Sequence, residues 1–217
     1  MERLKDKIHK AEQKLLLPLY NNCKYLFEDK NISSHDHTHH MRVWEYSKTI
    51  LDALNNIKDI SYNTVESCLI ASLFHDTGLS ITPNKNHGRE SRDICFNYFE
   101  NSNLNKPENF EEILNSIEKH DDKEYKTKSQ ADSILSILSI ADDLDAFGNI
   151  GVIRYTEIYL MRGISINELP KLVLENLDKR FLNFEKDFKI YPDLFTNHKS
   201  RYLITRKFFE ELNKEIT

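Results

Sequence analysis

The stretch from Ala131 to Phe147 is the most apolar part of this 217-residue chain. Its apolar side chains recur at the spacing expected of a helix that is buried on most of its surface. Such a helix has to be enclosed by other elements, so we expect it at the centre of the fold. The residues that define this pattern are Ile134, Leu135, Ile137, Leu138, Ile140, Ala141 and Leu144.

The same helix ends in three aspartates, Asp142, Asp143 and Asp145. Asp142 and Asp145 are three residues apart and share a face, whereas Asp143 points elsewhere. Buried carboxylates are unfavourable without partners, and like charges close together repel each other. A cation near the end of this helix is therefore the simplest explanation.

A second apolar helix, over residues 64–78, ends in the dipeptide His75-Asp76. Gly78 is expected to stop this helix in a left-handed conformation. The partial negative charge at a helix C-terminus favours a cation, and a metal ion would satisfy the imidazole, the carboxylate and the helix end together. For the dipeptide alone, a capping pair without metal is the simpler interpretation, but it leaves the aspartates of the first helix unexplained.

A histidine-rich segment precedes both helices and is expected to start a helix that runs from His35 towards Leu54. His35, His39 and Arg42 have the spacing i, i+4 and i+7, which places them on one face of this helix. The sequence of the segment is His35-Asp36-His37-Thr38-His39-His40.

In chain order, the three helices therefore present His39, then His75-Asp76, then Asp142. Two imidazoles and two carboxylates form a mixed nitrogen and oxygen site. That chemistry suits Mn, Fe(II), Co, Ni or Mg better than a structural zinc site, which favours thiolates. The three cysteines have no paired spacing and are expected to be free thiols, with Cys68 and Cys95 buried.

Composition agrees with a single all-α domain. Only five glycines and five prolines are present, 39% of the residues are hydrophobic and 30% are charged. The net charge of -5 argues against nonspecific nucleic-acid binding. With no transmembrane run and no signal peptide at the start, the sequence predicts a cytoplasmic protein without membrane contact.

Several other segments are expected to be helical. The N-terminal helix, over residues 3–27, contains Pro18, which should kink or divide it. Two amphipathic helices, over residues 168–188 and 193–215, are interpreted as scaffold or as a dimer surface.

Two further histidines lie where helices begin or end. His87 opens a helix whose first turn could bind an anion through its backbone N–H groups, or could simply be a solvated helix start. His120 continues an apolar stripe, so its side chain should point into the protein as a core histidine or as a ligand.

Taken in order, these residues resemble the HD-domain metal-dependent phosphohydrolases, and most closely a YedJ/YpgQ-like bacterial group. The resemblance is strong over residues 31–163, and weaker over residues 164–217, whose helices would pack on that core within one domain spanning 1–217. The matching motifs are His35-Asp36-x-x-His39-x-x-Arg42-Val43, Leu73-Phe74-His75-Asp76-Thr77-Gly78, His87-x-x-x-Ser91, Ile117-x-x-His120, Ile140-Ala141-Asp142-Asp143-Leu144-Asp145-Ala146 and Gly148-x-x-Gly151-x-x-Arg154.

The resemblance implies an all-α HD-domain helical bundle with a divalent metal ion (Mn, Mg, Fe, Co or Ni) held by His39, His75, Asp76 and Asp142. The implied reaction is hydrolysis of a nucleotide or other phosphorylated small molecule by a metal-activated water. Pyrophosphate release from a nucleoside triphosphate is the leading expectation. A nucleoside monophosphatase, a cyclic-nucleotide phosphodiesterase and a non-enzymatic nucleotide or metal sensor are the alternatives, and a homodimer is compatible with each.

The resemblance also suggests roles for other residues. Asp145 is expected either to accept a hydrogen bond from a metal ligand or to position water as a base. His87 and His120 are expected to bind phosphate, to protonate the leaving oxygen, or to hold a second metal.

Two arginines and one substitution complete these expectations. Arg154 is expected to clamp a phosphate. Arg42 is a candidate for substrate contact, although an ion pair with Asp76 or Asp142 is favoured. Position 143 is Asp where the group usually has Arg, so a basic residue beside the metal is missing.

Overall fold

The computed structural model describes residues 2–30, 32, 34–82, 87–122 and 130–216. Within these ranges every regular element is a helix, which confirms the predicted all-α fold class. The elements are α1 (Leu4–Ala11), a π-helical turn (Glu12–Leu16), α2 (Leu17–Phe27), α3 (His37–Asn55), α4 (Tyr62–Phe74), a 3-10 turn (Thr77–Ser80), α5 (His87–Asn101), α6 (Phe110–Lys119), α7 (Ile134–Asp145), α8 (Gly148–Met161), α9 (Leu169–Phe188) and α10 (Pro192–Ile216).

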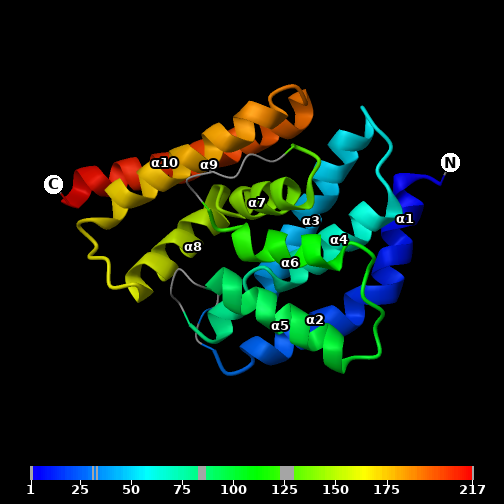
Figure 1. The fold of residues 1–217 in the computed structure, drawn as a ribbon. Coiled ribbons are helices and arrows are strands. Elements are labelled where there is room, and N and C mark those ends of the chain that lie inside the picture. The colour runs from blue at the N-terminus through cyan, green and yellow to red at the C-terminus, as the bar shows by residue number, and fades with distance from the viewer. Residues whose placement is uncertain (1, 31, 33, 83–86, 123–129, 217) are drawn as a thin grey trace.

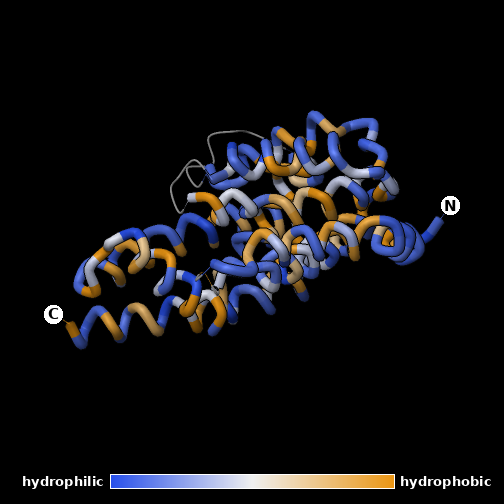
Figure 2. The backbone as a smooth tube through the Cα atoms, turned by 90° about the horizontal axis from the view of Figure 1, so that it is seen from below, coloured by the Kyte–Doolittle hydropathy of each residue, from blue (hydrophilic) through white to orange (hydrophobic). Residues whose placement is uncertain are grey.

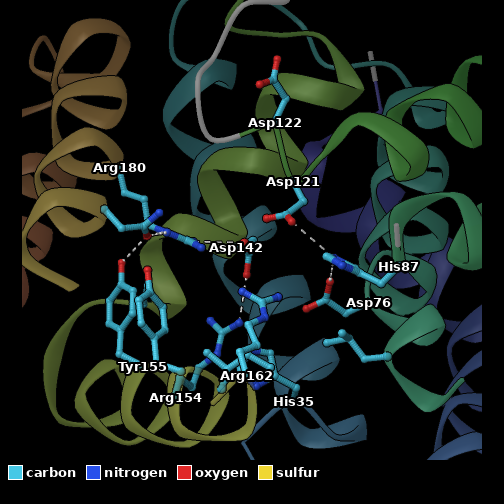
Figure 3. A pocket seen from close by; sticks show the side chains of 15 residues that line it. His35, Asp76, His87, Asp121, Asp122, Asp142, Arg154, Tyr155, Arg162 and Arg180 are labelled. Carbon is cyan, nitrogen blue, oxygen red and sulfur yellow. Dashed lines mark hydrogen bonds and ion pairs between the residues drawn. The ribbon is translucent and has the colours of Figure 1, made fainter. Parts of the chain in front are cut away.

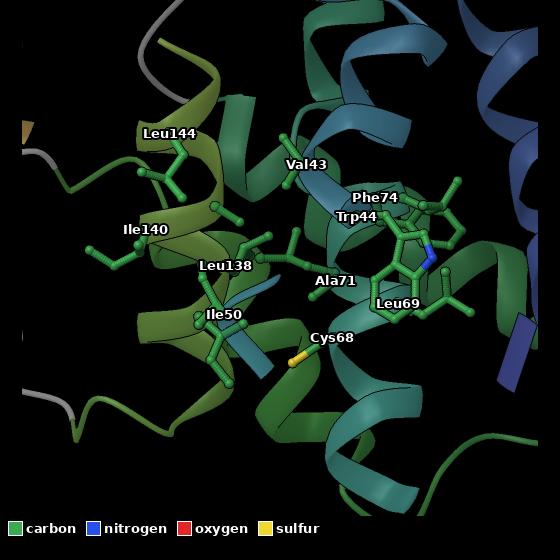
Figure 4. Packing of buried hydrophobic residues seen from close by; sticks show 14 of the residues in the cluster. Val43, Trp44, Ile50, Cys68, Leu69, Ala71, Phe74, Leu138, Ile140 and Leu144 are labelled. Carbon is green, nitrogen blue, oxygen red and sulfur yellow. The ribbon is translucent and has the colours of Figure 1, made fainter. Parts of the chain in front are cut away.

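The centre of the molecule is formed by α3, α4 and α7, which pack on one another (Figure 1). Every residue of α4 from Val65 to Phe74 is buried, and in α7 only Leu135 is not fully buried. Figure 4 shows side chains from the three helices meeting, among them Val43, Leu69 and Leu138. The prediction that the most apolar stretch lies at the centre is therefore confirmed.

Pro18 divides the N-terminal helical segment as predicted. The chain remains helical from Leu4 to Phe27, but the residues just before the proline form the π-helical turn. A proline ring collides with the carbonyl group four residues earlier and cannot donate a hydrogen bond, so the wider turn accommodates it within a continuous helical path.

The last two helices, α9 and α10, pair with each other, and we call them the C-terminal hairpin. Its α9 packs on α7 and α8, while α10 contacts α8 and α3. Figure 2 shows the C-terminal end of α10 extending beyond the body of the molecule, with polar and apolar residues alternating along the helix. Among the described residues, no helix has the length and apolar character needed to cross a membrane.

The end of α4 differs from the prediction at Gly78. The helix stops at Phe74, and Gly78 lies in the 3-10 turn without a positive φ. A Cβ atom at Gly78 would lie 2.1 Å from the backbone oxygen of His87, and one at Gly88 would lie 2.5 Å from that of Glu118. These two glycines are therefore needed for close approach. Together they allow the start of α5 to pack closely on the 3-10 turn that follows α4 and on the end of α6.

Candidate metal centre

The predicted site residues lie where helix ends meet. His39 is near the start of α3, His75 and Asp76 follow α4, and Asp142 is in the last turn of α7. All four residues are buried. Helix C-termini carry partial negative charge, so the ends of α4 and α7 add to the negative potential of the two carboxylates. The location therefore favours a cation.

One atom from each of these four residues lies within 4.8 Å of the others. We call His39, His75, Asp76 and Asp142 the primary cluster. The Nε2 atom of His39 is 3.0 Å from Nε2 of His75, 3.2 Å from Oδ2 of Asp76 and 3.7 Å from Oδ1 of Asp142. The cluster can therefore hold a metal ion, and nitrogen and carboxylate donors suit a divalent cation.

The other nitrogen of each imidazole shows why a cation fits. Nδ1 of His75 donates to the backbone oxygen of Ser72 at 2.9 Å, and Nδ1 of His39 donates to Oδ2 of Asp145 at 2.7 Å. In a neutral ring this leaves Nε2 as an acceptor, so the two facing Nε2 atoms both present lone pairs. Two lone pairs at this distance repel each other unless positive charge lies beside them. The Arg154 guanidinium supplies some of that charge to His39, and a divalent ion between the two nitrogens would supply more.

Protonation of the cluster is set by burial and by neighbouring charge. Burial lowers the pKa of His75 to about 3, so its imidazole is neutral near pH 7. Burial alone would raise the pKa of Asp76, but the surrounding histidines, His75, His120, His39 and His87, outweigh it and hold that pKa well below the usual value. A neutral imidazole and an ionised carboxylate are the forms that bind metal.

Asp145 lies behind His39 rather than in the cluster. Its side chain is fully buried, and besides His39 it accepts two hydrogen bonds from Arg42, from Nε at 2.8 Å and from Nη2 at 3.0 Å. Burial would raise the pKa of Asp145, but the charge of Arg154 and the hydrogen bonds from His39 and Arg42 lower it. Arg42 therefore pairs with Asp145. The prediction that it pairs with Asp76 or Asp142 is wrong.

The second oxygen of Asp76 faces a different group. Oδ1 of Asp76 lies 3.0 Å from Nε2 of His120 and 3.2 Å from Nε2 of His87. Nδ1 of His120 donates to the backbone oxygen of Ile117 at 2.7 Å, which directs Nε2 towards the aspartate. We call Asp76, His87 and His120 the secondary cluster, and it too can hold a metal ion. Asp76 thus belongs to both clusters, with one oxygen turned to each.

A cavity of about 370 Å³ opens beside both clusters. Figure 3 shows Arg180 and Tyr155 at one side of it, His87 and Asp76 at the other, and Asp142 between them. Of the predicted site residues, Asp76, His87, Asp142 and Arg154 line it. The remaining lining residues are His35, Leu79, Asp121, Asp122, Ala146, Tyr155, Ile158, Tyr159, Arg162, Asn176 and Arg180.

Arg154 joins the cavity to the primary cluster. Its Nη2 atom lies 3.1 Å from Oδ1 of Asp142 and 3.2 Å from Nε2 of His39, and its Nη1 atom lies 3.2 Å from Asp145. Its buried Nε has no hydrogen-bond partner among the described residues. The arginine therefore brings positive charge to the wall of the cavity, while its Nε atom is enclosed by the protein.

Arg180 is a site residue that the sequence did not reveal. It comes from α9, and its Nη1 atom contacts Oδ2 of Asp142 at 3.1 Å and Oδ1 of Asp143 at 2.9 Å. Sequence reasoning interpreted its helix as scaffold or dimer surface. Arg180 follows Lys179 in an ordinary amphipathic pattern, so nothing local distinguishes it. The basic residue found missing at position 143 is thus matched by an arginine from another helix.

Comparison with known proteins gives one match. The family model for the HD domain matches residues 37–146, which is just over half of the chain. This range contains both clusters and ends one residue after Asp145. No curated protein and no solved structure matches the chain.

Proposed function

The chain belongs to the HD domain family, and from this we propose that it is a metal-dependent phosphohydrolase acting on nucleotides. The observation that carries the proposal is the primary cluster, in which both imidazoles turn an acceptor nitrogen towards two buried carboxylates beside a cavity that Arg154 and Arg180 line. Members of this family are generally metal-dependent hydrolases, and the buried donors agree with that chemistry.

Under this proposal His39, His75, Asp76 and Asp142 are the residues that hold a divalent ion. When bound, such an ion would act as a Lewis acid, which lowers the pKa of a bound water and offsets negative charge on a phosphoryl group. Asp145 keeps the ring of His39 oriented, and Arg42 in turn fixes Asp145. Neither residue lines the cavity, so the structure favours this supporting role over direct substrate contact.

The charge balance around the clusters explains why an anionic substrate would need the ion. Four buried carboxylates face three guanidinium groups here, which leaves one net negative charge when the imidazoles are neutral. One divalent ion turns this into one net positive charge, so a phosphate is attracted after the metal has bound. The residues counted are Asp76, Asp142, Asp143 and Asp145, with Arg42, Arg154 and Arg180.

The cavity provides the groups for substrate binding. Arg154 and Arg180 line it with positive charge, and phosphate oxygens accept charge-assisted hydrogen bonds from guanidinium groups. His87 lines the cavity, whereas His120 is buried behind Asp76 and does not. Direct contact with a leaving oxygen therefore suits His87 better than His120. A second metal ion bound by the secondary cluster is the other role open to this pair.

We propose a nucleoside triphosphate as substrate, with release of pyrophosphate, as the HD-domain resemblance implies. The chemistry of the cavity supports this choice: arginines line it beside the primary cluster, and Tyr155 and Tyr159 can contact a base.

A panel of nucleoside tri-, di- and monophosphates and cyclic nucleotides, tested with Mn, Mg, Co and Ni, examines the proposal. Products have to be resolved, because pyrophosphate supports the triphosphate reaction. Orthophosphate or a linear monophosphate would identify a monophosphatase or a cyclic-nucleotide phosphodiesterase instead. No turnover with any metal and nucleotide would contradict the enzyme proposal and leave a sensor.

A further inference from the structure

The C-terminal hairpin contributes a charged side chain to the cavity. Arg180 lies in the second half of α9, and its side chain is 12% exposed where it lines the cavity. It is separated from Asp142 by 38 positions in the sequence, yet the two contact each other directly. A helix that packs on α7 from outside thus reaches the edge of the primary cluster (Figure 3).

We infer that Arg180 is a substrate-binding residue whose guanidinium holds a phosphate oxygen in the cavity, and that Asp143 is the carboxylate that positions it. This inference rests on the proposed function, because it assigns a phosphorylated substrate to the same cavity. It goes beyond that function by placing part of the substrate site on a helix outside the matched family region.

The contacts of Arg180 fix the direction of its guanidinium. Nε donates to Oδ1 of Asn176 at 2.9 Å, and Nη1 contacts both aspartates of α7. The group also lies 5.9 Å from the centre of the Tyr155 ring, and Tyr155 donates its hydroxyl to the same Asn176 oxygen at 2.9 Å. A guanidinium held on several sides loses little conformational freedom on binding an anion.

Asp143 holds this arginine through a contact of 2.9 Å between Oδ1 and Nη1. Its side chain is fully buried and does not line the cavity, whereas Arg180 does. A buried carboxylate is unfavourable unless it is paired, so Asp143 strongly favours the position of the guanidinium seen here. The pair as a unit adds no net charge, but it places the positive member at the cavity wall and the negative member behind it.

This arrangement makes a prediction that a purely structural ion pair does not. If Arg180 only neutralises Asp143, then removing both charges together should restore the site. If its guanidinium binds phosphate, the same double change should still weaken phosphate binding, although the net charge is unchanged.

The test compares four proteins: the wild type, Arg180→Gln, the double variant Asp143→Asn with Arg180→Gln, and the control Asp178→Asn with Arg206→Gln. The control neutralises an ion pair in the same hairpin, and neither of its residues lines the cavity. The double variant removes the buried Asp143 carboxylate together with the guanidinium that pairs with it, so it keeps the test valid if Arg180→Gln alone does not fold.

Each protein is saturated with Mn²⁺, and binding of inorganic phosphate and of pyrophosphate is measured by titration calorimetry. Mn²⁺ affinity is measured in a separate titration, in which electron paramagnetic resonance detects the free ion. We expect Arg180→Gln and the double variant to bind phosphate about 10-fold to 100-fold more weakly than the wild type, because a charge-assisted hydrogen bond is lost. The control should match the wild type, and the double variant should keep its Mn²⁺ affinity within about 3-fold, because its net charge is unchanged.

Two results would overturn the inference, and they are distinguishable. A double variant that binds phosphate as the wild type does would show that Arg180 is structural, while leaving the proposed function intact. A wild-type protein that binds Mn²⁺ but neither phosphate nor pyrophosphate would contradict the proposed function as well.

Discussion

The primary and secondary clusters share Asp76, but they are supported in different ways. In the primary cluster, each imidazole has its Nδ1 atom fixed by an acceptor of the protein, Asp145 for His39 and the Ser72 oxygen for His75. Its residues lie on α3, on α7 and directly after α4, the three helices of the core.

The secondary cluster lies at the junction of the start of α5 and the end of α6, with His87 at the cavity wall. The close approaches at Gly78 and Gly88 hold this junction together. A group fixed inside the core is suited to keeping an ion, whereas a group at the cavity wall is suited to engaging what enters. Two sets of similar residues around one carboxylate are therefore suited to different steps, one to holding the ion and the other to engaging the substrate.

The largest expected effect comes from breaking the primary cluster. In His75→Ala or Asp142→Ala, metal binding and turnover should be lost together, with activity reduced roughly 10³-fold or more because the ion's several kcal/mol of transition-state stabilisation are removed. Metal content and turnover of the purified variants provide the measurement. Full turnover with stoichiometric metal in either variant would contradict the assignment.

His40 offers a matched control for that experiment. It follows His39 and is equally buried. Its Nδ1 atom lies 3.2 Å from the backbone oxygen of Ser72, which His75 also contacts, but His40 belongs to neither cluster. His40→Gln should therefore retain metal and most of the activity.

A smaller effect is expected when the primary cluster is loosened without loss of a ligand. Asp145→Asn is nearly isosteric but removes the charge that orients His39, and such supporting changes typically weaken metal binding about 10-fold to 100-fold. Mn²⁺ titration of the variant checks this. If Asp145→Asn bound Mn²⁺ as tightly as the wild type, fixation of the imidazole would not explain the difference between the clusters.

The secondary cluster should respond differently from the primary one. His87→Gln is expected to leave the tight Mn²⁺ site unchanged and to lower turnover about 10-fold to 100-fold, because a group at the cavity wall is lost. Mn²⁺ binding isotherms alongside steady-state kinetics separate the two quantities. A wild-type isotherm with a second, weaker step that His87→Gln abolishes would assign a second ion to this cluster. Loss of the tight step instead would show that the two clusters are one unit.

The last expected effect is on the stability of the metal-free protein. The pKa of His75 is about 3 when folded and about 6.5 when unfolded, so the unfolded chain binds the proton more readily. Its contribution to the free energy of unfolding is complete above pH 6.5 and is lost as the pH falls towards 3, by about 1.4 kcal/mol for each pH unit. Urea unfolding of the wild type and of His75→Gln between pH 7 and pH 4 measures it. Parallel pH dependence in the two proteins would show that His75 does not titrate in this way.

Much of the fold could be predicted from local pattern. The apolar stretches of α4 and α7 are recognisable as buried helices because their apolar residues recur at helical spacing along the sequence. Their ends were identified as a site because His75, Asp76 and Asp142 are residues that a buried helix end does not tolerate alone. The outcome at Pro18 was predictable for a similar reason, since the effect of a proline is local.

Other features escaped sequence reasoning because they depend on contacts between distant segments. Gly78 was predicted to end a helix through a left-handed conformation, but it is needed where α5 approaches. Arg42 was expected to pair with Asp76 or Asp142, yet it pairs with Asp145, since the relative rotation of α3 and α7 decides which carboxylate it meets. No local pattern could indicate that Arg180 reaches the cavity.

Residue type and helical spacing were enough to predict imidazoles and carboxylates at the ends of apolar helices, a combination that favours a cation. How those groups are divided between the two clusters follows from the packing of the helices. That packing turned one oxygen of Asp76 to each cluster, placed Asp145 behind His39, and brought Arg180 from the C-terminal hairpin to Asp142. The physical reason is that residue type and helical spacing fix which groups are buried, whereas the direction of each hydrogen bond depends on how the helices pack together.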